Sequence, residues 1–197
     1  AVLDRLRVGE VNRAREVHWC ASGKVLNVGL ALTQLGASVR TLSLVGSGAA
    51  GEATRRDMAD LGVDVRWIES RATPRVCTTL LDRESGQTTE IVENSAPATK
   101  SELIAFESAF ADESAKSDAE MLILTGSLPT GTPKDLYSTL LSRVRAPVIL
   151  DIRGGELLAA LPHRPLVVKP NREELGHTVL RELSTDEDVW QAMLEIN

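Results

Sequence analysis

The sequence predicts an α/β protein whose mostly parallel, doubly wound sheet is covered by helices on both faces. From Val39 onward, short apolar segments of strand character mostly alternate with segments whose apolar residues recur at helical spacing. This order is typical of crossover connections between parallel strands. A chain of 197 residues with 43% hydrophobic residues is also long and apolar enough to bury a sizeable core. We therefore expect one α/β domain that needs no disulfide or metal to hold it together.

Local signals delimit the predicted elements. Gly36 and Gly46 end a helix and a strand, Pro133 stands at the first position of another helix, and Thr99 with Glu102 has the spacing of a capping box. The predicted helices span 25–35, 53–61, a segment from 99 onward, 132–143, 156–161, 172–180 and 186–196. The predicted strands between them span 39–45, 63–68, 121–124, 148–150 and 166–168.

Some predicted strands do not fit the alternation with helices. Residues 1–8 and 11–20 have partial strand character, and 76–81 with 88–92 flank a glycine-containing turn, as in a β-hairpin. We expect these segments to form a small separate sheet. Because the chain begins inside a strand pattern and stops inside a helical pattern, we also expect it to be a fragment of a longer protein.

Composition and charge exclude several functional classes. The net charge of −6 and the 3% of aromatic residues argue against a general nucleic-acid surface. No apolar run approaches the roughly 20 residues that cross a bilayer, so no membrane segment is expected. Cys20 and Cys77 lack the spacing of a metal or redox motif, and we interpret them as buried thiols of a cytoplasmic protein.

Four motifs follow predicted strands or open predicted helices, where ligands bind in α/β sheets. The first, 46–51, reads GSGAAG, and Glu69 follows about 20 residues later. This pattern is typical of the dinucleotide-binding turn of an NAD-dependent oxidoreductase, in which glycines let the backbone approach a pyrophosphate. The alternative is that small residues from Gly46 to Gly51 satisfy a tight strand-to-helix turn.

The second motif, Ser22 to Asn27, combines a glycine turn, a cation and an amide directly before a helix. Backbone amides near Gly23, the Lys24 ammonium and the Asn27 side chain would suit a phosphate or a polyol. A loop with one solvated lysine explains the same residues. The third motif, 125–131, has glycines that would let a ligand approach the backbone, and an ordinary turn is its alternative.

The fourth motif runs from Lys169 to Glu174 after the last predicted strand. Asn171 and Glu174 have the spacing of an N-cap residue and its capping-box partner, which would satisfy free amides at a helix start. The same two oxygens would also suit a Mg²⁺-bound phosphate, with water between them, because Mg²⁺ usually keeps several waters. These two roles are compatible.

The order and spacing of these motifs resemble the ribokinase-like (PfkB) family of sugar kinases, in particular its branch with 1-phosphofructokinase and tagatose-6-phosphate kinase. The similar segments are 9–13 (GEVNR), 22–27 (the family's GGKGxN), 73–75 (TxR), 126–129 (GSLP) and 169–174 (KPNxEE). The resemblance covers nearly the whole chain.

The resemblance implies a ribokinase-like α/β domain over residues 1–197, truncated at both ends, with small β-lid strands at about 1–20 and 63–93. The implied activity is ATP- and Mg²⁺-dependent phosphoryl transfer to a hydroxyl of a ketohexose phosphate. Some members of the family dimerise through the lid, so the implied partners are a sugar phosphate and a second copy of the chain. The glycines of 46–51 would then border the sugar site and would not bind a dinucleotide.

The resemblance also assigns site residues. The substrate and its phosphate would be bound by Gly23, Lys24, Asn27 and Arg75, and ATP with Mg²⁺ by Lys169, Asn171 and Glu174. No catalytic residue is assigned, because the family's GAGD segment with its aspartate base would lie beyond Asn197. The family's NPAxD strand would lie upstream of Ala1.

Several positions depart from the family pattern. Ser22 and Val25 replace family glycines, and Cys77 stands where this branch usually has Asn. Asp151 matches the aspartate of the family's DxSG, but the next residues differ. These departures leave the identity of the sugar open, and a non-catalytic sugar-phosphate-binding protein on the same fold is an alternative.

Overall fold

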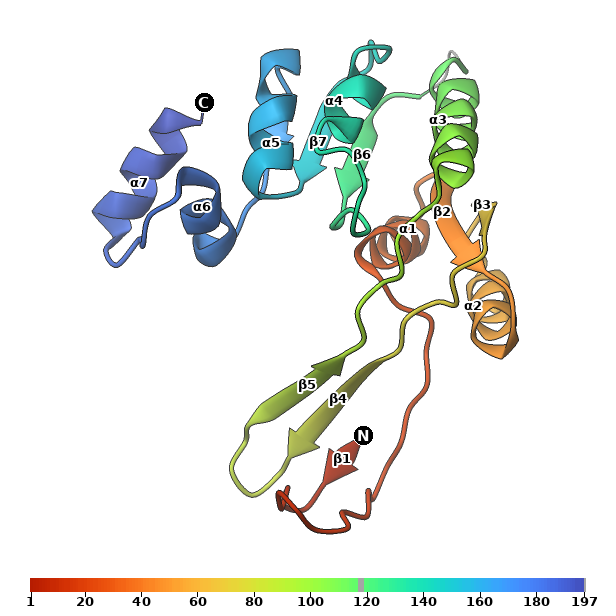
Figure 1. The fold of residues 1–197 in the computed structure, drawn as a ribbon, viewed down its shortest axis with the longest axis vertical. Coiled ribbons are helices and arrows are strands. Elements are labelled where there is room, and N and C mark those ends of the chain that lie inside the picture. Colours follow the sequence, from red (N-terminus) through yellow and green to blue (C-terminus); the bar gives the residue numbers. More distant parts are fainter. Residues whose placement is uncertain (117–118, 197) are drawn as a thin grey trace.

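The computed structural model describes residues 1–116 and 119–196 and has an α/β part and a projecting β arm (Figure 1). The α/β part contains two parallel sheets. One pairs β2 (Thr41–Gly46) with β3 (Val65–Ser70), and the other has the order β6 (Leu122–Thr125), β7 (Val148–Asp151) and β8 (Val167–Val168). These strands confirm the predicted α/β class with parallel strands.

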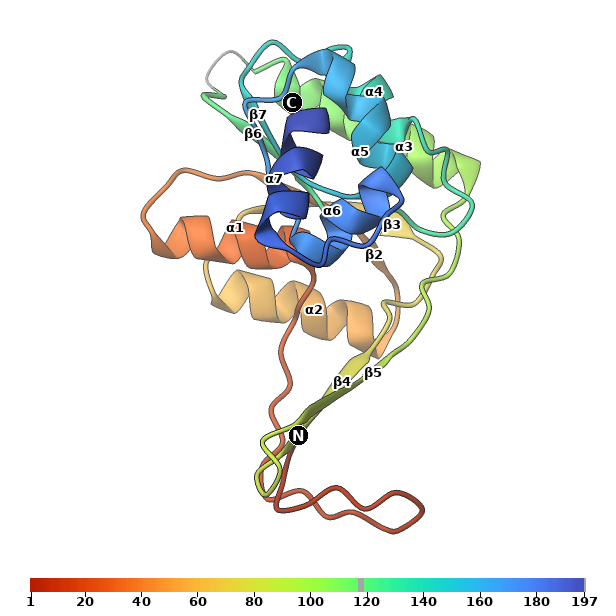
Figure 2. The same ribbon diagram turned by 90° about the vertical axis from the view of Figure 1, so that its left-hand side faces the viewer.

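Seven α-helices connect and cover these strands in the part of the chain that the structure describes. They are α1 (Lys24–Gln34), α2 (Ala49–Asp60), α3 (Lys100–Ser114), α4 (Leu136–Leu141), α5 (Gly154–Ala160), α6 (Arg172–Val179) and α7 (Asp186–Glu195), with a 3₁₀ turn at Leu161–His163. Helices α1, α2 and α3 pack around β2 and β3, and α1 also contacts β6 (Figures 1 and 2). Helix α1 therefore lies against both parallel sheets.

Side chains cap three of the helices. Thr99 caps α3 with its hydroxyl, and its backbone amide donates the reciprocal bond to the Glu102 carboxylate, as predicted. Asn171 with Glu174 closes the same box on α6, and Thr185 closes one on α7. Each box satisfies backbone amides that have no partner inside the helix.

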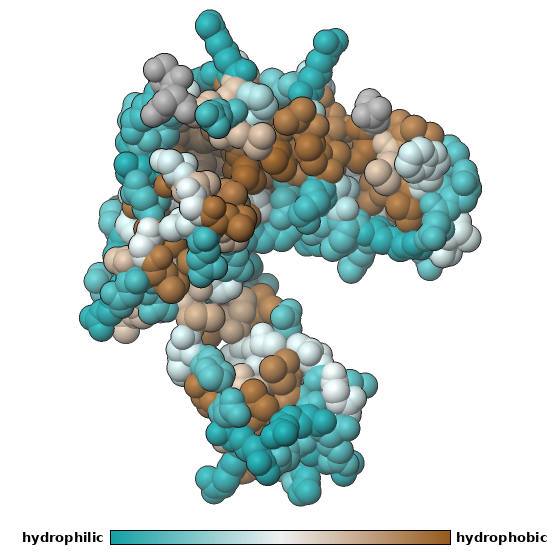
Figure 3. Space-filling view, turned by 180° about the vertical axis from the view of Figure 1, so that it is seen from behind, coloured by the Kyte–Doolittle hydropathy of each residue, from teal (hydrophilic) through white to brown (hydrophobic). Residues whose placement is uncertain are grey.

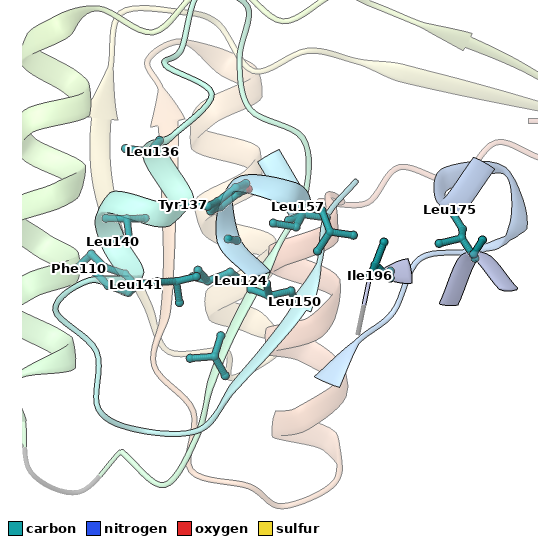
Figure 4. Close-up of a cluster of buried hydrophobic side chains, with 14 of the residues drawn as sticks. Phe110, Leu124, Leu136, Tyr137, Leu140, Leu141, Leu150, Leu157, Leu175 and Ile196 are labelled. Atoms are coloured by element: carbon teal, nitrogen blue, oxygen red, sulfur yellow. The ribbon is translucent and has the colours of Figure 1, made fainter. Parts of the chain in front are cut away.

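The larger hydrophobic cluster lies where β6 and β7 meet α3, α4 and α5 (Figure 4). Leu150 and Leu157 are fully buried there, and Leu175 and Ile196 extend the cluster to α6 and the end of α7. A smaller cluster of Leu26, Met58 and Val63 joins α1, α2 and β3. Burying one such side chain completely stabilises the folded state by about 1.5–3 kcal/mol.

The arm is a separate sheet of β1 (Val2–Leu3), β4 (Cys77–Asp82) and β5 (Thr88–Val92), with β1 parallel and β5 antiparallel to β4. We use "arm" for residues 1–16 and 77–92. The chain crosses between the arm and the α/β part three times, at 17–22, 71–76 and 93–98 (Figure 1). Neither hydrophobic cluster of the described residues includes an arm residue.

The space-filling view shows apolar surface on the arm as well as on the α/β part (Figure 3). Exposed apolar side chains of the arm include Val8, Val11, Leu81 and Ile91. None of the helices that the structure describes has both the length and the hydropathy that a membrane crossing requires.

The structure corrects several predictions. Residues 11–20 form no strand, because only an isolated bridge between Val2 and Glu16 pairs this region. The expected lid range 63–93 begins too early, because β3 pairs with β2 and not with the arm. Pro133 does not open α4, since two successive turns place the N-cap at Asp135.

Both cysteines are exposed, which overturns the expectation of two buried thiols. Cys20 lies in the first crossing, and Cys77 begins β4 at the base of the arm. Neither position packs against a hydrophobic cluster, so the apolar character of a thiol does not bury it here.

Candidate functional site

Three polar side chains follow the strands of the β6-β7-β8 sheet at the same edge. Thr125 ends β6, Asp151 ends β7, and Lys169 comes directly after β8. Thr125 and Asp151 are register partners, and the Thr125 hydroxyl donates a hydrogen bond of 2.9 Å to Asp151 Oδ2. This edge is where parallel α/β sheets bind their ligands.

Helix α1 brings Lys24 to this edge. Gly23 precedes the helix with φ 136°, a backbone conformation that favours glycine, and Lys24 is the first helical residue. The Lys24 ammonium lies 3.1 Å from Glu174 Oε1 and 3.5 Å from Asp151 Oδ2. Its side chain is nevertheless 47% exposed, so an anion from solvent can reach it.

Glu174 uses its two oxygens for two different purposes. Oε2 accepts a hydrogen bond of 3.0 Å from the Asn171 amide, which closes the capping box. Oε1 faces Lys24. Helix capping therefore involves Oε2 only. The other role considered for this motif, binding of a Mg²⁺-bound phosphate, can use Oε1.

Both carboxyl groups are held in the ionised form. Burial alone would raise the pKa of Asp151, but Lys169, the Thr125 hydroxyl and the charge of Lys24 outweigh it and lower the pKa below its ordinary value. The pKa of Glu174 is lowered chiefly by the hydrogen bond from the Asn171 backbone amide; burial opposes this effect, and Lys24 lowers the pKa further. Two fixed negative charges therefore face two ammonium groups at this edge.

The donor set fits Mg²⁺ bound together with phosphate better than a complete protein cage. No group of three or more histidine, cysteine or acidic side chains suited to a metal occurs within residues 1–116 and 119–196. Mg²⁺ typically takes one or two carboxylates, several waters and substrate phosphates. Asp151 and Glu174 supply the carboxylates, and the buried Oδ1 of Asp151 has no aligned hydrogen-bond donor, although Lys169 Nζ lies 3.1 Å away.

The structure gathers only some of the predicted site residues. Lys24, Lys169 and Glu174 meet around Asp151, and Asn171 holds Glu174. Asn27 is exposed one helical turn after Lys24. Arg75 is exposed in the second crossing, and no carboxylate of the described residues pairs with it.

Sequence reasoning assigned no site role to Asp151 or Thr125. Both residues end short apolar strands, and polar residues at strand ends are the signal that could have found them. Gly126 continues this edge with φ 103°, and a Cβ there would come within 3.9 Å of the Lys24 side chain.

The GSGAAG segment has a packing explanation. A Cβ on Gly46 would lie 1.7 Å from the Ala72 carbonyl oxygen, and one on Gly51 would lie 1.9 Å from the Gly46 carbonyl oxygen. Glycine is therefore required where β2, α2 and the second crossing approach one another. The pattern needs no dinucleotide to account for it.

Comparisons with known proteins identify the family and the fold. The family model "pfkB family carbohydrate kinase" matches residues 2–197. Phosphofructokinase-2 from Escherichia coli, in its tetrameric inhibited form, has a TM-score of 0.85 and 28% sequence identity, with 99% of this chain and 64% of that chain covered. The same enzyme in complex with fructose-6-phosphate gives a TM-score of 0.84 at 27% identity, over 99% and 64% of the two chains.

A possible 1-phosphofructokinase from Thermotoga maritima has the same fold, with a TM-score of 0.87 at 18% identity over 99% of this chain and 63% of that chain. The chain thus spans less than two thirds of the length of these relatives. Because the family model matches nearly every residue, the chain belongs to the pfkB family of carbohydrate kinases.

Proposed function

We propose that this chain is part of an ATP- and Mg²⁺-dependent kinase that transfers a phosphoryl group to a hydroxyl of a ketohexose phosphate. The observation that carries the proposal is the position of Lys24. Its half-exposed ammonium lies against the carboxylates of Asp151 and Glu174, which come from the far end of the chain. A cation for an anionic substrate and carboxylates for Mg²⁺-ATP are thus adjacent, as phosphoryl transfer requires.

The substrate side would consist of Lys24, Asn27 and Arg75. Lys24 and Asn27 are three positions apart on α1 and so are neighbours on the helix surface, where an ammonium and an amide suit a phosphate and sugar hydroxyls. Arg75 would add a two-pronged contact to the phosphate. The 27% identical relative solved with fructose-6-phosphate supports a substrate of this class.

The nucleotide side would consist of Lys169, Asn171, Glu174 and Asp151. Asp151 and Glu174 would hold Mg²⁺ together with ATP, and the metal would supply positive charge against the charge that develops on the phosphates. The Lys169 side chain is 68% exposed, and its ammonium would bind a phosphate oxygen, while Asn171 keeps Glu174 oriented. Asp151 pairs with the ammonium groups of both Lys24 and Lys169 at the strand ends. It would thereby keep the sugar-phosphate side and the nucleotide side of the site adjacent.

The arm would act as the lid of this site. Its base, the second crossing, carries Arg75, so closure of the arm would bring this cation towards the sugar phosphate and exclude water from the transfer.

We also propose a homodimer through the arm, since its sheet exposes apolar side chains and the similar phosphofructokinase-2 is tetrameric in one form. The proposed compartment is the cytoplasm.

The test is to incubate the full-length protein that contains this chain with Mg²⁺-ATP and fructose 1-phosphate, fructose 6-phosphate or tagatose 6-phosphate, and to measure ADP formation. The proposal expects sugar-dependent ADP formation that stops when EDTA removes Mg²⁺. Sugar-phosphate binding without ADP formation would identify a non-catalytic binding protein instead. Binding of NADH without binding of ATP would overturn the proposal in favour of an oxidoreductase.

A further inference from the structure

Glu102 connects two of the three crossings between the arm and the α/β part. Its Oε1 accepts a hydrogen bond of 2.6 Å from the Arg71 amide, at the start of the second crossing. Its Oε2 accepts bonds of 2.6 Å from the Thr99 amide and 2.8 Å from the Thr99 hydroxyl, directly after the third crossing. One carboxylate therefore ties together segments that lead into and out of the β4-β5 hairpin.

The Glu102 carboxylate is both buried and charged, and these two properties strengthen the hydrogen bonds that it accepts. Glu102 is one of the few buried charged residues, at 7% exposure. Its amide and hydroxyl partners lower its pKa from 4.5 to about 2, so it stays charged at every ordinary pH. Hydrogen bonds to a charged acceptor are stronger than neutral ones.

Helix capping alone does not require this arrangement. The box on α7 has the same threonine at the N-cap, but an aspartate, Asp188, in the place of Glu102. Asp188 Oδ2 accepts both from the Thr185 amide and from its hydroxyl. The shorter side chain thus closes a complete box, and the additional length of Glu102 serves the bond to Arg71.

The second crossing is also held from its other side. The Ala72 carbonyl lies so close to Gly46 that a Cβ there would clash with it, and the ring of Pro74 packs against the same glycine. Residues 71–74 are therefore anchored between β2 and the start of α3. Arg75 is the first residue after these anchors.

We infer that Glu102 is a positioning residue, which fixes the base of the arm and thereby places Arg75 for the phosphate of the substrate. This inference rests on the proposed function for the identity of the ligand of Arg75. The fixed arm geometry itself does not depend on that ligand.

Glu102→Asp is the sharpest test, because it keeps the charge and the capping box but withdraws the carboxylate from Arg71. Asp188→Glu is the matched control, since it changes side-chain length in a box that joins no crossings. We expect Glu102→Asp to weaken binding of fructose 6-phosphate about tenfold or more in calorimetry, with less than about twofold change for Mg²⁺-ATP. Glu102→Gln, which keeps the length but lowers the acceptor strength, should act in the same direction if Glu102→Asp fails to fold.

Arm geometry is measured separately with spin labels at Thr89→Cys on β5 and Ser108→Cys on α3, after replacing Cys20 and Cys77 by serine. Glu102→Asp should broaden or shift the distance between the labels, and Asp188→Glu should not. An unchanged distance in both Glu102 variants would overturn the inference, as would a changed distance with unchanged sugar-phosphate affinity. If the unsubstituted protein binds no sugar phosphate, the proposed function fails, while the distance measurement still decides whether Glu102 positions the arm.

Discussion

The ammonium of Lys24 lies 3.1 Å from Oε1 of Glu174, although 150 positions separate the two residues in the chain. Lys24 belongs to the proposed sugar-phosphate side, and Glu174 belongs to the proposed Mg²⁺-ATP side. The pair is partly exposed, so its own contribution to stability is at most about 1 kcal/mol. Its position at the contact between the two sides matters more for function than for folding.

Replacing Lys24 by methionine tests the substrate side. The variant keeps most of the side-chain volume but removes the charge, so we expect sugar-phosphate affinity to fall about tenfold to a hundredfold, as for loss of a charged hydrogen bond. Calorimetric titration with fructose 6-phosphate measures the change. Lys100→Met, at the start of α3, is the control for removing an exposed lysine. Equal affinity in both variants would exclude Lys24 from the site.

Replacing Arg75 by alanine should weaken sugar-phosphate binding by about tenfold or more and leave Mg²⁺-ATP binding almost unchanged. Arg75→Lys should restore only part of the affinity, because an ammonium lacks the two-pronged geometry of a guanidinium. Separate titrations with the two ligands measure both effects. Arg83→Ala, in the turn of the arm, is the control, and identical sugar affinity in the two alanine variants would remove Arg75 from the site.

Glu174→Gln separates metal binding from helix capping. Glutamine can still accept the bond from the Asn171 amide, so the fold should persist and the melting temperature should change little. The lost charge should raise the Mg²⁺ concentration needed for half-maximal ATP binding several-fold. Glu173→Gln, its exposed neighbour, should leave this concentration unchanged. Unfolding of Glu174→Gln would show that capping is its main role.

Glu102 should make stability depend on pH in the acid range. Its pKa is lowered from 4.5 to about 2 in the folded state, so its contribution is fully present above about pH 4.5. That contribution is lost as the pH falls towards 2, because the carboxylate must then be protonated. Denaturant unfolding at several pH values should show the stability difference between the unsubstituted protein and Glu102→Gln shrinking over this window. Glu107→Gln on the same helix should show no such change.

Gly46→Ala and Gly48→Ala distinguish packing from ligand approach in the GSGAAG segment. The Cβ of Gly46→Ala would meet the Ala72 carbonyl, so we expect a loss of about 3 kcal/mol or more. Gly48 has φ 85° and ψ −179° but open space around it, so its substitution should cost about 1–3 kcal/mol of backbone strain. Chemical denaturation measures both, and the reverse order would contradict the packing explanation.

Much of the α/β part could be predicted from the sequence because its signals are local. The capping box of Thr99 and Glu102 needs only residues three apart in the sequence. The apolar runs of β6 and β7 are themselves enough to predict buried strands. Lys24, Lys169 and Glu174 were assigned by the resemblance to the family. Of these, only Lys169 lies at the carboxyl end of a strand, where parallel sheets bind their ligands.

Other features depend on partners that local patterns do not show. Residues 11–20 alternate like a strand, but Val11 is exposed and the segment has no ladder of hydrogen bonds among the described residues. The composition of β3 did not show that its partner is β2. Asp151 was matched to a family motif but received no site role, because its significance comes from Lys24, which is distant in sequence and adjacent only after folding.

The separation of the arm from both hydrophobic clusters has a consequence for how the molecule opens. Three crossings and their hydrogen bonds join it to the α/β part, so little apolar surface opposes its local unfolding. Amide protons of β4 and β5 should therefore exchange with solvent through sub-global openings that leave β6 and β7 protected. A binding element that opens at low cost can admit and release ligands while the rest of the molecule keeps its native packing.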